Sequence, residues 1–331
     1  MKISATLFLA LALTGAAPES IYHNGWIDFN KNGQKDIYED PAQSVDARVE
    51  DLLRQMTVEE KTCQLVTLYG CGRVLKDPQP TEKWADEVWK DGIANIDEML
   101  NGYGKAYPKY VDMIYPFSNH VEALHNVQRW FVENTRLGIP AEFSNEGIHG
   151  LNHTKATPLP APIAIGSTWD RSLVRQAGDI AGHEAQLTGY HSVYAPILDV
   201  ARDQRWGRTL ECYGEDPYLV GELGSQMAQG IQQWEGVSAG IKHYVAYSVP
   251  KGGRDADCRT DPHITPRELH EIFLYPFRKV FAEAHPLIVM SSYNDWNGEP
   301  VSASSPGIAR YRQACGACPR QRPASYGQLG E

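Results

Sequence analysis

Apolar residues recur at helical spacing through much of the first half of the chain. In residues 45–56 they lie three or four positions apart, which predicts an amphipathic helix; these positions are Val45, Val49, Leu52, Leu53 and Met56. Thr57 and Glu60 form a capping-box pattern that predicts the start of a second helix. A third helix is predicted over 120–135. The segment 72–115 has weak periodicity, and we interpret it as a long surface insertion.

From residue 139 onward, short apolar runs alternate with helical patterns. The runs IPAEFS, SVYAPILD, GIKHYVAY and LIVMSSYND are each followed by a polar loop, and helices are predicted over 218–233 and 266–284. Continuous apolar strands separated by helices are typical of a parallel sheet covered by helices. The sequence therefore predicts an α/β fold.

Side chains able to bind or react follow these predicted strands. Glu146, Arg208, Lys242, His243 and Tyr293 each lie at or just after a strand end. Parallel sheets bind their ligands at the carboxyl ends of the strands. A carboxylate, two cations, an imidazole and a phenol ring suit a sugar, because its hydroxyl groups both donate and accept hydrogen bonds. We therefore predict a small site for one sugar ring.

Each of these residues also has a structural interpretation. Lys242 and His243 could form a buried pair, and Arg208 could bridge to Glu211 or Glu215. The shared position of all the candidates at strand ends favours the binding site over several unrelated structural roles.

An Asp- and Asn-rich loop precedes the first helix. Its spacing matches the twelve-residue calcium loop, with Gly33 at the sharp turn and candidate ligands Asp28, Asn30, Asn32, Asp36 and Glu39. Two features weaken the match, since Lys35 replaces an apolar residue and no helix is predicted before the loop. The alternative is a polar turn with solvated charges.

Other metal or cofactor patterns are weaker. The stretch GGRDADCRTDPH contains Asp255, Asp257, Cys258, Asp261 and His263, but its spacing matches no standard site. Cys315 and Cys318 form a CxxC without a second pair. The sequence contains no P-loop, GxSxG or GxGxxG pattern. We predict no required cofactor, with a structural calcium ion as the one candidate.

Charge and the N-terminus restrict partners and location. The formal net charge of −10 argues against a nucleic-acid or anionic-membrane partner. Residues 1–17 have a Lys, an apolar run and small residues, which predicts a signal peptide and export to the periplasm or the extracellular space. No later stretch is apolar enough to predict a membrane span.

Five motifs occur in order along the chain, namely RVEDLLRQMTVEEK, NEGIHG, APILDVARDQRWGRTLECYGEDP, IKHYVAYS and VMSSYNDWNG. Together they resemble glycoside hydrolase family 3, which contains β-glucosidases and β-xylosidases. The resemblance implies a TIM-like (β/α)8 barrel, of which we count about five of the eight strands. It also implies that Glu146 is the acidic sugar ligand, often an Asp, that Arg208, Lys242 and His243 are the basic ligands, and that Tyr293 lies near the nucleophile.

The resemblance implies a retaining mechanism with an Asp nucleophile and a Glu acid/base. The nucleophile is expected roughly thirty residues after Tyr293, but no Asp follows Asp295. No catalytic residue is therefore identifiable, and we expect this chain to be inactive alone. From Ser305 the sequence becomes rich in Arg, Pro and Cys, which we interpret as truncation or a lost reading frame. The predicted parts are a signal peptide (1–17), a lead segment (18–40), a partial barrel (41–304) and an aberrant tail (305–331).

Three functions of the predicted sugar site remain open at this point, beside a calcium-dependent interaction module at Asp28–Glu39. The first is an exported hydrolase acting on the non-reducing end of β-linked glucosides or related oligosaccharides. The longer Glu146 side chain, in place of Asp, would reduce the space for a C6 hydroxymethyl group and so favours a β-xylosidase as the second. The third is a non-catalytic protein that binds a small oligosaccharide or β-glycoside.

Overall fold

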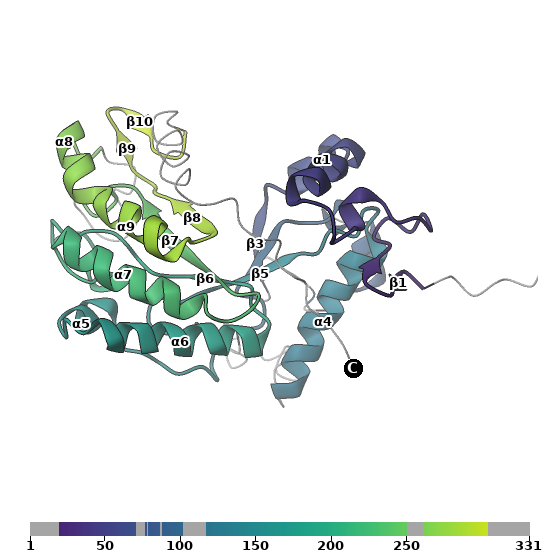
Figure 1. Cartoon of the computed structure of the whole chain (residues 1–331), viewed down its shortest axis with the longest axis horizontal. Coiled ribbons are helices and arrows are strands. Elements are labelled where there is room, and N and C mark those ends of the chain that lie inside the picture. The colour runs from purple at the N-terminus through teal and green to yellow at the C-terminus, as the bar shows by residue number, and fades with distance from the viewer. Residues whose placement is uncertain are drawn as a thin grey trace, which may run out of the picture.

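A parallel sheet forms the centre of the molecule. The computed structural model describes residues 20–70, 77, 79–86, 88–101, 117–249 and 261–303. Six strands pair in their sequence order, and every neighbouring pair is parallel (Figure 1). The strands are β3 (Thr67–Tyr69), β4 (Asn95–Asp97), β5 (Glu142–Glu146), β6 (Ser192–Tyr194), β7 (Ser238–Tyr244) and β8 (Ile288–Ser291). This order is that of an incomplete (β/α)8-like barrel, so the predicted fold class is confirmed, with six strands instead of about five.

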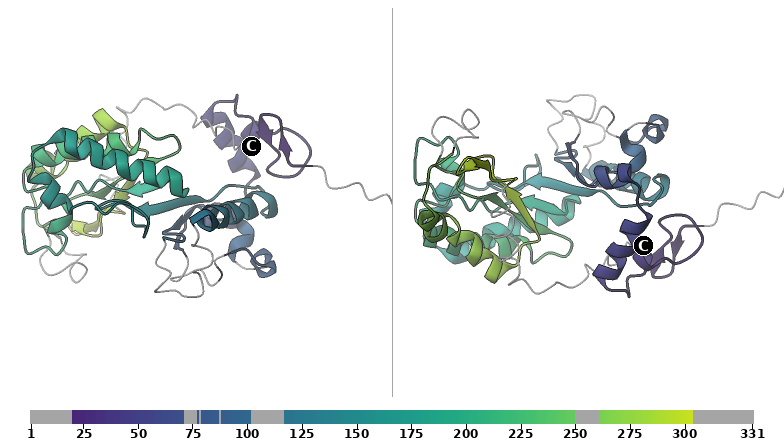
Figure 2. Two further views of the ribbon diagram at one scale, coloured as in Figure 1. Left: turned by 90° about the horizontal axis from the view of Figure 1, so that it is seen from below. Right: turned by 90° about the horizontal axis from the view of Figure 1, so that it is seen from above.

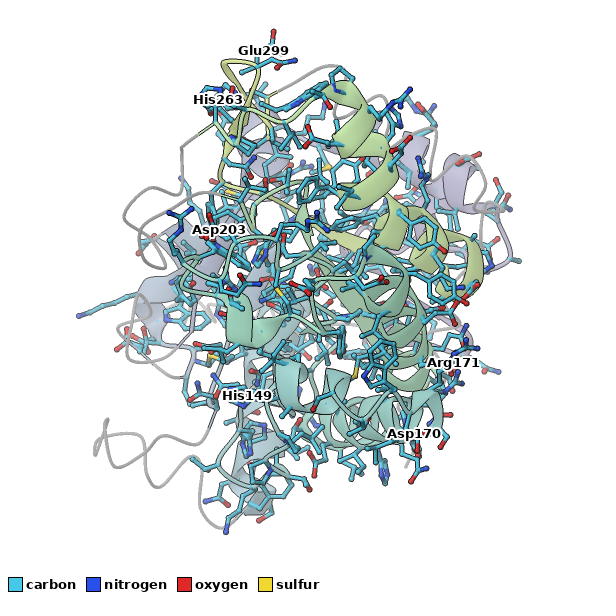
Figure 3. The ribbon with its side chains drawn as sticks, turned by 90° about the vertical axis from the view of Figure 1, so that its left-hand side faces the viewer. His149, Asp170, Arg171, Asp203, His263 and Glu299 are labelled. Carbon is cyan, nitrogen blue, oxygen red and sulfur yellow. The ribbon has the colours of Figure 1, made fainter. Side chains whose placement is uncertain are left out.

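Helices connect the strands and cover the outer face of the sheet. Figure 1 shows α6, α7 and α9 packed side by side along β6, β7 and β8, with α4 farther along the sheet. The helices after β4 are α4 (Phe117–Asn134), α5 (Pro162–Gly166), α6 (Arg171–Thr188), α7 (Pro217–Ile231), α8 (Pro266–Glu268), the π-helical turn η6 (Leu269–Phe273) and α9 (Tyr275–Ala284). Asp170 caps α6, because its carboxylate accepts the backbone N–H groups of Ser172 and Leu173 (Figure 3). Leu173 directly precedes the buried Val174 of this helix.

Glycine permits the close contact between α6 and α7. A Cβ atom at Gly182 would lie 2.3 Å from the carbonyl oxygen of Ile231, and one at Gly178 would lie 2.5 Å from that of Met227. No side chain fits at these distances, so the two helices touch through their backbones.

The N-terminal region lies at the opposite end of the molecule from α6–α9 (Figure 2). Ser44 caps α1 (Val45–Gln55), and Thr57 with Glu60 forms the predicted capping box of α2 (Val58–Cys63). Both predicted helices are confirmed. The smaller elements here are β1 (Tyr22–His23), β2 (Trp26–Ile27) and the 3-10 turn η1 (Ile37–Glu39).

The apolar face of α1 is only partly covered. Val45, Val49 and Leu53 lie four residues apart and are 43–47% exposed, and no residue of the helix is fully buried. Among the described elements, η1 makes the main contact with α1. The sequence therefore predicted the helix and its apolar stripe correctly, but the stripe faces largely into solvent.

The interpretation of residues 72–115 as a surface insertion is wrong for its described part. The 3-10 turns η2 (Glu82–Ala85) and η3 (Val88–Asp91) bury Trp84 and Trp89, and β4 is a central strand buried along its whole length. The segment lacked a readable pattern because β4 has only three residues, two of them polar. Asn95 and Asp97 frame the apolar Ile96.

The remaining elements lie after β6 and β8. They are η5 (Thr209–Glu211) and the hairpin of β9 (Asp295–Trp296) with β10 (Glu299–Pro300). No helix within the described ranges is long and apolar enough to cross a membrane. The predicted signal peptide, the tail from Ser305, most of the GGRDADCRTDPH stretch and the CxxC cysteines lie outside the described residues.

Candidate functional site

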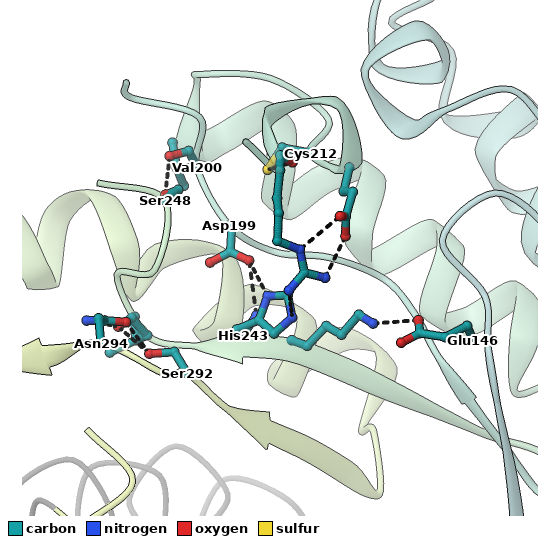
Figure 4. Close-up of polar contacts among 12 residues, drawn as sticks. Glu146, Asp199, Val200, Cys212, His243, Ser248, Ser292 and Asn294 are labelled. Carbon is teal, nitrogen blue, oxygen red and sulfur yellow. Dashed lines mark hydrogen bonds and ion pairs between the residues drawn. The ribbon is translucent and has the colours of Figure 1, made fainter. Parts of the chain in front are cut away.

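The five predicted site residues meet at the carboxyl end of the sheet. Glu146 ends β5, Lys242 and His243 lie in β7, Arg208 follows β6 in the loop before η5, and Tyr293 follows β8. Glu146 contacts Lys242, and His243 contacts both Arg208 and Asp199; dashed lines in Figure 4 mark these contacts. The rule that places ligands at strand ends therefore selected residues that are neighbours in space.

Lys242 and Glu146 form an ion pair across two strands. The Nζ atom of Lys242 lies 2.6 Å from Oε2 of Glu146, and it also lies 5.8 Å from the centre of the Tyr194 ring. The Lys242 side chain is 1% exposed, whereas that of Glu146 is 32% exposed. Glu146 is therefore the member of the pair that a ligand can reach from solvent.

Arg208 is held by a two-pronged ion pair with Glu211. Its Nε and Nη2 atoms donate to the two carboxylate oxygens at 2.8 and 2.7 Å. Burial opposes the charge of the guanidinium, but Glu211 outweighs it and raises the pKa of Arg208. Burial alone would raise the pKa of Glu211, yet the bonds from Arg208 lower it. Both groups are therefore charged, and the structural interpretation of Arg208 is correct for Glu211.

His243 joins Arg208 to Asp199. Nη1 of Arg208 donates to Nε2 of His243 at 2.9 Å, and Nδ1 of His243 lies 2.7 Å from Oδ2 of Asp199. A guanidinium only donates, so Nε2 must be the bare nitrogen and Nδ1–H must donate to Asp199. Burial lowers the pKa of His243, and Asp199 offsets this only in part. The imidazole is therefore neutral, with its tautomer set by both neighbours.

Aromatic rings pack around this chain of polar contacts. The Tyr247 ring lies 5.1 Å from that of His243, 5.3 Å from that of Tyr293 and 5.6 Å from the Arg208 guanidinium carbon. Trp206 packs edge-on against Tyr247 at 5.1 Å. Tyr293 is 53% exposed, so its ring forms the solvent-facing wall of the group.

A buried carboxyl group lies within electrostatic reach of the Glu146–Lys242 pair. Asp97, the last residue of β4, accepts a hydrogen bond from Oγ of Ser144 at 2.9 Å. Burial raises its pKa to about 7, and the nearby charges of Glu98 and Glu146 contribute in the same direction. Asp97 therefore titrates near neutral pH within the interior of the sheet.

Sequence reasoning missed three members of this group. Asp199 ends the apolar run SVYAPILD, so the strand-end rule that selected Glu146 could also have selected it. Tyr247 follows β7 in the same way. Asp97 gave no signal, because its strand was not recognised.

The groups of the site that solvent can reach are the Glu146 carboxylate and the Tyr293 phenol ring, whereas the basic side chains are buried. Arg208, Lys242 and His243 are 4%, 1% and 1% exposed. The positive charges of Arg208 and Lys242 are already matched by Glu211 and Glu146. A ligand reaching them must exchange hydrogen bonds with these partners, which hydroxyl groups can do because they donate and accept together.

The predicted calcium loop is held by its own hydrogen bonds. Asp28 accepts the backbone N–H groups of Asn32 and Gly33 at 3.1 and 2.8 Å, and Glu39 accepts that of Asp36 at 2.9 Å. Asn30 and Asn32 turn their amide nitrogens toward Asp36. A cation would need the amide oxygens there instead, so the loop fits calcium only after both amides rotate. In the part of the chain that the structure describes, no cluster of three or more His, Cys, Asp or Glu side chains could hold a metal ion. Calcium binding stays a prediction.

Comparison with protein families matches most of the chain. Residues 57–311 match the model of the glycosyl hydrolase family 3 N-terminal domain. A protein named as a β-xylosidase of Formosa agariphila is 30% identical over 278 residues, which are 80% of this chain and 34% of that protein. A protein named as β-glucosidase H of Emericella nidulans is 36% identical over 172 residues, which are 50% of this chain and 20% of that protein.

Solved structures show the same relationship. A β-glucosidase from Erythrobacter marinus superposes with a TM-score of 0.67 at 27% identity, covering 81% of this chain and 34% of that one. A β-glucosidase from Listeria innocua in complex with glucose gives a TM-score of 0.63 at 27% identity, covering 81% and 36%. The chain spans about a third or less of the length of these relatives. It belongs to glycosyl hydrolase family 3, and the matched residues are those of the family's N-terminal domain.

Proposed function

We propose that this chain carries the sugar-binding part of an exported hydrolase that acts on the non-reducing end of β-linked glucosides or related oligosaccharides. The Glu146–Lys242 ion pair is the observation that carries the proposal. It lies at the carboxyl end of the sheet and presents an accessible carboxylate with a buried ammonium behind it. The likeness to a β-glucosidase solved with glucose supports a sugar as the ligand.

Each residue has a role in this proposal. Glu146 accepts hydrogen bonds from two neighbouring hydroxyl groups, and Lys242 donates to one of them. Arg208 and His243 are held in place by Glu211 and Asp199 and supply further contacts from below. The exposed Tyr293 ring packs against a C–H face of the sugar. These contacts orient the sugar, because together they hold one pyranose ring at the end of the sheet.

Hydrolysis with retention requires two carboxylates on opposite sides of the glycosidic bond. The resemblance places the nucleophile beyond Tyr293, and no Asp follows Asp295 in this sequence. We therefore propose that this chain by itself binds a sugar without turning it over. On this basis a non-catalytic sugar-binding role is the second candidate function.

The length of Glu146 supports a pentose as the alternative ligand. Its side chain is one methylene longer than an Asp, so its carboxylate extends farther toward the position of a C6 hydroxymethyl group. This supports β-xylosidase specificity as the alternative to β-glucosidase specificity. In Glu146→Asp we expect the preference to move from xylose toward glucose.

Equilibrium dialysis of the full chain with labelled glucose and with labelled xylose tests these proposals. We expect Glu146→Ala to weaken binding of either sugar about tenfold or more, because a charge-assisted contact is lost. Unchanged affinity in that variant would overturn the assigned site. Turnover of an aryl β-glucoside or β-xyloside at ordinary enzyme rates would overturn the binding-only role. N-terminal sequencing of protein recovered outside the cytoplasm checks export.

A further inference from the structure

A second polar groove lies on the surface of α4. Its volume is about 280 Å³, and it runs between the last turns of α4 and the segment that leads to η2. α4 ends eight residues before β5 begins, so the groove lies near the start of β5, whereas Glu146 lies at the end of that strand. The lining residues are Gln79, Pro80, Asn126, Arg129, Trp130, Glu133 and Asn134.

The lining combines one aromatic ring with several kinds of hydrogen-bonding group. Trp130 supplies the indole, Asn126 and Asn134 supply carboxamides, and Arg129 and Glu133 supply one charge of each sign. Balanced charge argues against a simple anion or cation as the ligand. An aromatic face beside amide, guanidinium and carboxylate groups matches a neutral sugar, which has apolar C–H faces and hydroxyl groups around its edge.

The walls of the groove are fixed before any ligand arrives. Trp130 packs edge-on against Trp84 and Phe131, with ring centres 5.3 Å apart in both pairs. Asn126 donates to Gln79 at 3.2 Å, and Gln79 donates to the carbonyl of Ala123 at 3.1 Å. Groups that are already ordered lose little conformational entropy on binding.

Two donors are available for a ligand. Within the described part of the chain, the guanidinium of Arg129 and the indole N–H of Trp130 take part in no hydrogen bond or ion pair. Glu133 accepts a hydrogen bond from the Tyr22 hydroxyl at 3.0 Å, which leaves further acceptor capacity on its carboxylate. Drug-sized ligands occupy pockets of roughly 300–1,000 Å³. A groove somewhat below that range suits one ring of a longer chain.

We propose that this groove is a second carbohydrate-binding site, which holds one pyranose ring of a neutral β-linked polysaccharide against Trp130. The site would hold the protein on a polymer independently of the site at Glu146. The bound ring contacts the indole on one side and the Asn126 and Arg129 side chains at its edge.

Native gel electrophoresis through xylan and through a soluble β-glucan tests this proposal on the full chain. We expect at least one polymer to retard the chain, and Trp130→Phe to weaken that retardation about three- to tenfold, because the smaller ring loses stacking area and the N–H donor. Trp169→Phe is the matched control, since Trp169 is 71% exposed and does not line the groove. Its retardation should equal that of the unchanged chain.

Two further variants test the groove independently of the Trp130→Phe result. Asn126→Ala combined with Arg129→Ala removes polar contacts but leaves the packing of Trp84, Trp130 and Phe131, so it answers the question if Trp130→Phe fails to fold. Retardation that remains in Glu146→Gln and falls further when Trp130→Phe is added belongs to this groove, which separates it from the proposed sugar site. Absence of retardation by both polymers, or equal losses in the Trp130 and Trp169 variants, would overturn the proposal.

Discussion

The Nζ atom of Lys242 lies 2.6 Å from Oε2 of Glu146, although 96 residues separate the two in the sequence. Lys242 reaches this position from β7, two strands away from β5 in the sheet. The parallel arrangement makes the contact possible, because it brings the carboxyl ends of all strands to one edge.

Loss of the Glu146 carboxylate should destabilise the chain. Glu146→Ala leaves the ammonium of Lys242 buried without a partner, and we expect a cost of about 2 kcal/mol in the free energy of unfolding, reduced from the fully buried case because Glu146 is partly exposed. Urea denaturation measures this. Asp203→Ala is the control, since the Arg205 side chain that it pairs with is 67% exposed. That change should cost well under about 1 kcal/mol, and equal costs for both variants would contradict the burial argument.

Removal of Asp199 should change the tautomer of His243. In the unchanged chain we expect ¹⁵N shifts of a neutral ring with the proton on Nδ1, and a titration displaced below the ordinary histidine range, because burial lowers the pKa of His243. Asp199→Ala removes the acceptor of this proton and should cost about 1–3 kcal/mol of stability. Asp199→Asn keeps an oxygen acceptor and should preserve the tautomer. A mixed tautomer in the unchanged chain would refute the assignment.

Asp97 should make stability fall as the pH rises toward neutrality. Its pKa is about 7 in the folded chain and about 4 in an unfolded one, so the folded state binds more protons between these values. The stabilisation is complete below about pH 4 and is lost as the pH rises through 7. Asp97→Asn keeps the acceptor for Ser144 and should be more stable than the unchanged chain by about 2–4 kcal/mol at pH 8, with little difference near pH 4.

Urea midpoints at the two pH values check this prediction. Glu299→Gln is the matched control, because Glu299 lies exposed on the β9–β10 hairpin (Figure 3). Its stability difference from the unchanged chain should be the same at both pH values. A pH-independent difference for Asp97→Asn would show that Asp97 keeps one protonation state across this range.

The loop at Asp28–Glu39 gives a direct test of calcium binding. We expect calcium to raise the melting temperature of the full chain, and Asp28→Asn to abolish the rise, because Asp28 is the first ligand of the predicted set. Magnesium serves as the control ion, since it favours a smaller, octahedral set of ligands. A melting temperature that is unchanged by calcium or by a chelator would leave the hydrogen-bonded turn as the whole role of this loop.

The sequence predicted elements well where the local pattern and the tertiary environment agree. Thr57 and Glu60 correctly predicted the start of α2, and the apolar run before Glu146 correctly predicted β5. The sequence did not predict β4, because Asn95 and Asp97 face a polar interior and only Ile96 is apolar. A buried polar strand has no periodic signal, because its partners, such as Ser144, come from distant parts of the chain.

The candidate site shows the same division. The five residues could be selected from their positions at strand ends, because a parallel topology by itself brings these ends together. The pairing among them was not predictable, because Arg208 had both Glu211 and Glu215 within sequence reach. The structure shows that the i, i+3 partner Glu211, carried by η5, receives both guanidinium bonds.

The burial of Arg208, Lys242 and His243 has a consequence for the heat of the sugar binding that we propose. Each hydrogen bond that a sugar hydroxyl forms with these groups replaces one to Glu146, Glu211 or Asp199, so the number of bonds changes little. Binding at this site is therefore an exchange reaction with a small enthalpy. Its free energy then depends mainly on water released from the face of Tyr293 and from the sugar ring that covers it.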